Sequence, residues 1–168
     1  EFLEWLEKEI YPVEKGLRPI LSGWKPTKDA KPKVRKNFSD TQLKLIFESK
    51  AYKSGPIKLP SMFWAPLISL YTGARAGEIL QHEFTDIEQV DDIWIFNIND
   101  EDDKQVKTKA GIRTIPIHSK LIELGFLDFI KARKKTEMTR VFPEEPRNHN
   151  GQFDSFSKRF ATFKKNCG

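Results

Sequence analysis

The segment over residues 62–71 constrains the fold more than any other part of the chain. It reads MFWAPLISLY, and Ser69 is its main polar interruption. A helix that is apolar on all sides is buried on all sides, so we expect it at the centre of a domain. It is too short to cross a membrane, which takes about 20 apolar residues, and Pro66 lies within it. Gly73 follows closely and can adopt the left-handed conformation that ends a helix.

Apolar periodicity predicts the other elements. We expect helices over residues 1–10, 39–47, 62–71, 78–80, 119–124, 126–135 and 153–165. We expect strands over residues 93–96, 105–108 and 112–117, the last two joined as a hairpin around Lys109, Ala110 and Gly111. The predicted fold is therefore mainly α with a small three-stranded antiparallel β-sheet, an α+β class.

The first 36 residues differ in composition from the rest. Residues 25–36 combine prolines with lysines and read as an extended linker, so we expect one compact domain over residues 37–168. The chain begins with Glu1 inside an amphipathic pattern, and we interpret it as a piece of a longer protein. A single cysteine, Cys167, excludes an internal disulfide framework and a cysteine-rich metal site, and it fits a reducing, cytoplasmic setting.

The whole chain carries a net charge of +5, and many of its basic residues fall into three clusters. The clusters are Lys25, Lys28, Lys31, Lys33, Arg35 and Lys36; Lys131, Arg133, Lys134 and Lys135; and Lys158, Arg159, Lys164 and Lys165. Any one charge run is ordinarily a solvated surface. Three basic clusters and only one acidic loop, taken together, favour a polyanion-binding surface as much as a merely solvated one.

The acidic run over residues 100–103 (DEDD) could hold a divalent metal, as in a nuclease. Adjacent side chains on a turn diverge, however, so a solvated turn is the favoured interpretation. No histidine and cysteine spacing indicates zinc, and no glycine-rich phosphate loop occurs. We expect no metal and no cofactor.

Arg75 and the lysines of the predicted hairpin are the residues best suited to chemistry. Arg75 stands at the start of a helix, and Glu78 lies one helical step further on, so we expect a part-buried Arg75 paired with Glu78. Such a pair can be purely structural, or the guanidinium can clamp a phosphate. Lys107 and Lys109 alternate with their neighbours, which places both on one face of a strand.

Two motifs resemble those of the tyrosine recombinases, the phage integrase family. Residues 71–80 (YTGARAGEIL) resemble the first conserved box of this family, and residues 107–117 (KTKAGIRTIPI) resemble the hairpin with its catalytic lysine. Phe38, Ser39 and Asp40, with Leu43 and Phe47, resemble the first helix of the catalytic domain. The resemblance covers roughly residues 37–165 and implies a partial catalytic domain over 37–168, preceded in 1–36 by the end of a DNA-binding domain and its linker.

The resemblance also implies roles. Arg75 would stabilise the scissile phosphate, Glu78 would support Arg75, and Lys107, or alternatively Lys109, would protonate the leaving oxygen. Lys31, Lys33, Arg35, Lys36, Lys158, Arg159, Lys164 and Lys165 would contact DNA. Double-stranded DNA and a homotetramer on paired sites are the implied partners, in a bacterial or phage-derived protein associated with the nucleoid. No cofactor is implied.

Parts of the family's catalytic set are absent from this sequence. Tyr11, Tyr52 and Tyr71 all precede the lysine segment, and no His-x-x-Arg box follows it, so we expect this chain alone to be inactive. The alternative function is a noncatalytic helical DNA-binding module. Whether Arg75 and the lysines meet at one phosphate-sized site would discriminate between the two.

Overall fold

A computed structural model describes residues 37–53 and 59–167 of the chain. The compact unit begins at Phe38. Several expectations lie outside the described residues: the helix over 1–10, the linker over 25–36, and the DNA contacts assigned to Lys31, Lys33, Arg35 and Lys36.

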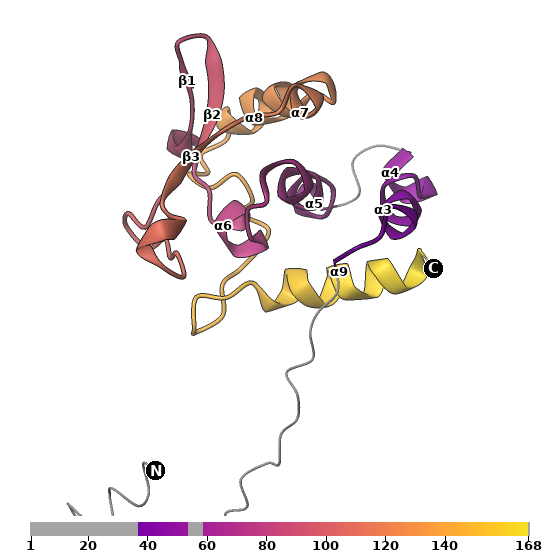
Figure 1. The fold of residues 1–168 in the computed structure, drawn as a ribbon. Coiled ribbons are helices and arrows are strands. Elements are labelled where there is room, and N and C mark those ends of the chain that lie inside the picture. Colours follow the sequence, from indigo (N-terminus) through magenta and orange to yellow (C-terminus); the bar gives the residue numbers. More distant parts are fainter. Residues whose placement is uncertain (1–36, 54–58, 168) are drawn as a thin grey trace, which may run out of the picture. The chain divides into compact units, whose positions relative to one another are not determined.

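The described residues form mainly α-helices, with a small sheet at one side of them, in line with the predicted α+β class (Figure 1). The α-helices are α3 Asp40–Phe47, α4 Lys50–Lys53, α5 Pro60–Thr72, α6 Ala76–Leu80, α7 Ser119–Glu123, α8 Phe126–Lys134 and α9 Asp154–Asn166. The 3₁₀ turns are η1 Phe84–Asp86 and η2 Lys109–Gly111, and the strands are β1 Ile87–Val90, β2 Ile93–Ile98 and β3 Arg113–Pro116. None of the helices within residues 37–53 and 59–167 has the length and hydropathy that a membrane span requires.

The sheet has the predicted number of strands and direction, and the strands predicted over residues 93–96 and 112–117 are present as β2 and β3. Its order is β1-β2-β3 with both pairs antiparallel, and Phe96 of β2 faces Ile87 on one side and Ile115 on the other. The expected strand over residues 105–108 is wrong, because that segment is irregular and β1 takes its place. Only Ile87 of β1 is buried, so the strand lacks the apolar alternation that would reveal it.

Helix α5 is the central element, as expected. Its residues Ser61 to Ile68 are all buried, and Figure 1 draws it among α3, α6, α8 and α9. The ring of Trp64 packs edge-on against Phe63 and Phe126, with centroids 4.9 and 5.1 Å away. Gly73 ends the helix in the left-handed conformation (φ 66°), which confirms the predicted break.

Helix α9 packs its phenylalanine stripe inward. Phe153 and Phe156 are buried, while Phe160 and Phe163 are partly buried against the same core, which confirms the amphipathic pattern. At the N-terminal start of the compact unit, Ser39 and Gln42 form a reciprocal capping box that begins α3.

Candidate functional site

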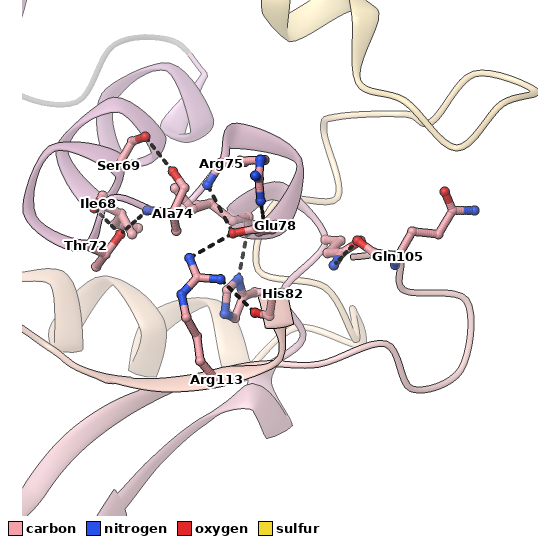
Figure 2. Close-up of polar contacts among 12 residues, drawn as sticks. Ile68, Ser69, Thr72, Ala74, Arg75, Glu78, His82, Gln105 and Arg113 are labelled. Atoms are coloured by element: carbon pink, nitrogen blue, oxygen red, sulfur yellow. Dashed lines mark hydrogen bonds and ion pairs between the residues drawn. The ribbon is translucent and has the colours of Figure 1, made fainter. Parts of the chain in front are cut away.

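The joint between α5 and α6 is held rigidly by side-chain hydrogen bonds (Figure 2). The Thr72 hydroxyl donates to the Ile68 carbonyl (2.6 Å) and accepts from the Ala74 amide (3.1 Å). The Ser69 hydroxyl donates to the carbonyl of Ala74, which is itself buried, at 2.7 Å. With Gly73 in its left-handed conformation, these bonds fix the backbone immediately before Arg75.

Arg75 is the N-cap residue of α6, and the predicted pair with Glu78 is present. The Arg75 amide donates to Oε2 of Glu78 (3.2 Å), and Nη1 of Arg75 donates to Oε1 (2.7 Å). Glu78 is buried, but the Arg75 side chain is 61% exposed, so the expectation of a part-buried arginine is wrong. The extended backbone of the cap turns this side chain outward, while neighbouring Ala74 fills the buried position.

A second arginine reaches the same carboxylate. Nη2 of Arg113 donates to Oε2 of Glu78 (3.0 Å), and Nη1 of Arg113 donates to the Gly111 carbonyl (2.7 Å). Figure 2 shows Arg75 and Arg113 approaching Glu78 from two sides. The sequence pattern did not single out Arg113 as a site residue. The available signal was its place in β3, where alternation puts Arg113 on the same inward face as Ile115.

The electrostatics of this cluster favour ionised Glu78. Burial alone would raise the pKa of the Glu78 carboxyl, but the hydrogen bonds from Arg75 and then Arg113 outweigh it and hold that pKa below its ordinary value. The ionised carboxylate and two guanidinium groups carry one net positive charge. A positive, partly exposed cluster of this kind suits an anionic ligand.

The segment over residues 105–112, here called the lysine loop, carries both candidate lysines. Lys107 and Lys109 are exposed, and neither forms an ion pair with another described residue. The expectation that both project from one face of a strand is wrong, because Lys107 lies in irregular chain and Lys109 begins η2.

The start of the lysine loop is fastened to α6 and to the core. The Gln81 side chain accepts from the Gln105 amide (2.9 Å) and donates to the Gln105 carbonyl (3.1 Å). Just before it, the buried Lys104 ammonium donates to Asp86 (2.8 Å). The backbone amide and carbonyl of residue 105 therefore bond to the side chain of Gln81, the C-cap residue of α6, and not to a neighbouring strand.

The basic residues of α9 are in unlike environments. Lys158 and Lys165 are exposed. Arg159 instead forms an ion pair with Glu145, whose side chain is fully buried. The Lys164 ammonium lies over the rings of Phe38 and Phe160, at 5.0 and 5.4 Å from their centroids. Lys158 and Lys165 are thus the members of this cluster most available to a polyanion.

The acidic run gives no support to a metal site. Among the described residues, no group of three or more histidine, cysteine, aspartate or glutamate side chains is arranged to hold a metal ion. Asp103 is instead paired with Arg147 (2.6 Å), and residues 100–102 are exposed.

The two described tyrosines have contacts of their own. Tyr52 is buried and its hydroxyl donates to the Met62 carbonyl (3.1 Å), and burial raises the pKa of that hydroxyl. The ring of Tyr71 stacks on His118, with centroids 4.5 Å apart. Tyr11 lies outside the described residues.

No protein-family model matches this chain, and comparison with curated proteins and with solved structures gives no match either.

Proposed function

We propose that this chain supplies the Arg75 and lysine half of the catalytic centre of a tyrosine recombinase, which cuts and rejoins DNA strands. The family resemblance of residues 71–80 and 107–117 suggests this function. The proposal also includes double-stranded DNA as ligand, a tetramer on paired sites, and a tyrosine and a His-x-x-Arg box from further chain.

One observation carries the proposal: Arg75 is held on one edge and open on the other. Its Nη1 is bonded to the buried Glu78, while 61% of the side chain is exposed. A guanidinium held in this way is preorganised, so it can donate to two phosphate oxygens without first losing side-chain freedom.

The residues of this chain divide the proposed reaction between them. Attack by a tyrosine on the scissile phosphate forms a 3′-phosphotyrosyl bond and releases the 5′-oxygen. Arg75 stabilises the charge that develops on the nonbridging oxygens, and Glu78 holds Arg75 in place. Lys107, or alternatively Lys109, donates a proton to the departing 5′-oxygen.

The test is covalent trapping by the full-length protein on nicked duplexes that span the ends of its own genetic element. We expect a protein–DNA adduct on a denaturing gel. Arg75→Lys should lower the rate of its formation by about 10²–10³, because lysine keeps the charge but cannot donate to two oxygens in fixed geometry. The fold should persist, as judged by circular dichroism.

Arg147→Lys is the matched control. Arg147 also donates from Nη1 to a carboxylate, that of Asp103 (2.6 Å), and the substitution should leave cleavage unchanged. Salt-sensitive DNA binding by the full-length protein without any adduct would instead identify a noncatalytic DNA-binding module. An adduct mapped to Tyr11, Tyr52 or Tyr71 would contradict the expectation that the nucleophile comes from further chain.

A further inference from the structure

We propose that Arg113 is a positioning residue that keeps the lysine loop in register with Arg75 and keeps the shared cluster positively charged. The inference rests on the proposed function and assigns a role in it to a residue outside the Arg75, Glu78 and lysine set. It follows from the two hydrogen bonds that one guanidinium makes, one to Glu78 and one to the Gly111 carbonyl.

The Arg113 guanidinium joins the end of the lysine loop to Glu78. Arg113 binds Glu78 through Nη2 (3.0 Å) and the Gly111 carbonyl through Nη1 (2.7 Å). Gly111 closes η2, where its amide donates to the Thr108 carbonyl (2.7 Å). The rigid fork of an arginine can hold both acceptors at a fixed separation, which a single ammonium cannot do. The end of the lysine loop is thereby tied to the carboxylate that holds Arg75.

Arg113 also sets the net charge of the cluster that it forms with Arg75 and Glu78. Glu78 and Arg75 alone would form a neutral pair, and a neutral pair attracts a phosphate weakly. Arg113 is only 32% exposed, and it supplies the second positive charge to the same carboxylate. Glu78 can then hold Arg75 without cancelling the attraction of the cluster for an anion.

The two ends of the loop are thus fastened independently. Gln81 holds residue 105 at the start, and Arg113 holds Gly111 at the end. Removing Arg113 should free the end of the loop while the start stays in place. The effect is therefore expected at Gly111 and Ile112, whose amides donate within η2, and not at Gln105.

Amide hydrogen exchange in this chain tests the geometry without DNA. Arg113→Lys should raise exchange at Gly111 and Ile112 by about tenfold, the effect of losing one ordinary hydrogen bond, and leave Gln105 unchanged. Arg75→Lys, which alters the other side of the same carboxylate, should not change exchange at Gly111. Unchanged exchange at Gly111 and Ile112 in folded Arg113→Lys would overturn the tie.

Cleavage by the full-length protein tests the role in the reaction. The two substrates carry either oxygen or sulfur at the 5′-bridging position, and sulfur leaves without a general acid. Arg113→Lys keeps the charge, so its rate should fall about tenfold on the oxygen substrate and recover on the sulfur substrate. Arg113→Gln removes the charge, so its rate should stay low on both.

The outcomes separate this inference from the function on which it rests. An equal deficit of Arg113→Lys on both substrates would overturn the positioning role, and full recovery of Arg113→Gln on sulfur would overturn the charge role, while cleavage by the unaltered protein stands. Absence of an adduct from the unaltered protein would refute the proposed function and the positioning role with it. Arg147→Gln is the control for loss of a part-buried guanidinium elsewhere, and it should retain both rates.

Discussion

Glu78 accepts a 3.0 Å hydrogen bond from Arg113, which lies 35 positions further along the chain. The bond to Arg75 spans only three positions and stays within one helical turn. One buried carboxylate therefore joins a local cap of α6 to a strand of the sheet. The tertiary structure, and not α6 alone, determines how Arg75 is held.

Substitution of the left-handed Gly73 should lower the stability of the protein, whereas substitution of the nearby Gly77 should not. Gly73→Ala is expected to lower the free energy of unfolding by roughly 1–2 kcal/mol, because φ is 66° there and a Cβ is strained in that conformation even though space is open around it. Gly77→Ala is the matched control. Gly77 lies within α6 with open space around a Cβ, so alanine there should raise the free energy of unfolding by about 0.5–1 kcal/mol.

Urea denaturation of both variants measures these changes. Equal effects at the two positions would contradict the strain assigned to Gly73.

His82 should make the protein less stable on mild acidification. Its Nδ1 lies 3.2 Å from the Ile79 carbonyl, and its buried Nε2 has no hydrogen-bond partner among the described residues. Burial lowers the pKa of His82 below its ordinary 6.5, with Asp86 opposing the shift and Lys104 adding to it. The unfolded chain then binds a proton that the folded chain does not, so the free energy of unfolding falls as the pH drops below 6.5.

Below pH 6.5 the free energy of unfolding should fall by up to about 1.4 kcal/mol per pH unit. His82→Gln should remove this pH dependence. Urea denaturation at about pH 7.5 and pH 5.5 measures it. Glu78 and Asp86, whose pKa values are also lowered, lose their contributions only at more acidic pH. His149→Gln, at an exposed histidine, is the control. The same pH dependence in His82→Gln as in the unaltered chain would contradict this origin.

Local pattern predicted the parts of the fold that local interactions determine. The apolar run of α5, the break at Gly73, the phenylalanine stripe of α9 and the pairing of Arg75 with Glu78 all follow from spacings of a few residues. The lysine loop was mispredicted because alternation over residues 105–108 carries no information on what its backbone bonds to. The bonds of Gln105 to Gln81, and of Arg113 to Glu78, join segments far apart in sequence, and no single segment displays them.

Neighbouring basic residues of α9 should behave differently. Lys158→Gln is expected to leave stability unchanged and, if α9 contacts DNA as proposed, to reduce the salt slope of binding by about 0.9. Arg159→Gln should instead lower the free energy of unfolding by about 2–3 kcal/mol, because the fully buried Glu145 would then keep, among the described residues, only the Ser61 hydroxyl as a side-chain donor. Denaturation in urea and DNA titration across salt concentrations separate the two effects. A change in salt slope for Arg159→Gln alone would reverse the assignment.

We expect Lys107, and not Lys109, to be the general acid. The resemblance favours Lys107, since the pair Lys107 and Thr108 matches the commoner spelling of the family's lysine motif. The expected support from a strand is absent, but another support takes its place. Lys107 follows Gln105 by two positions, and the two bonds from Gln81 hold that residue against α6, whose N-cap is Arg75. Lys109 belongs to the η2 turn, further from this attachment.

Alanine variants of both lysines, assayed in the full-length protein on oxygen and sulfur 5′-bridged substrates, decide between them. Lys107→Ala should be slow on the oxygen substrate by at least about 10², since general-acid catalysis contributes on the order of 10²–10⁴, and recover on the sulfur substrate. Lys109→Ala should retain most of its rate on both, because its exposed ammonium then serves only to attract DNA. Recovery of Lys109→Ala in place of Lys107→Ala would transfer the role to Lys109. If neither alanine variant recovers on the sulfur substrate, the proton comes from outside the lysine loop. The loop that Gln81 holds would then contribute only to binding the DNA backbone.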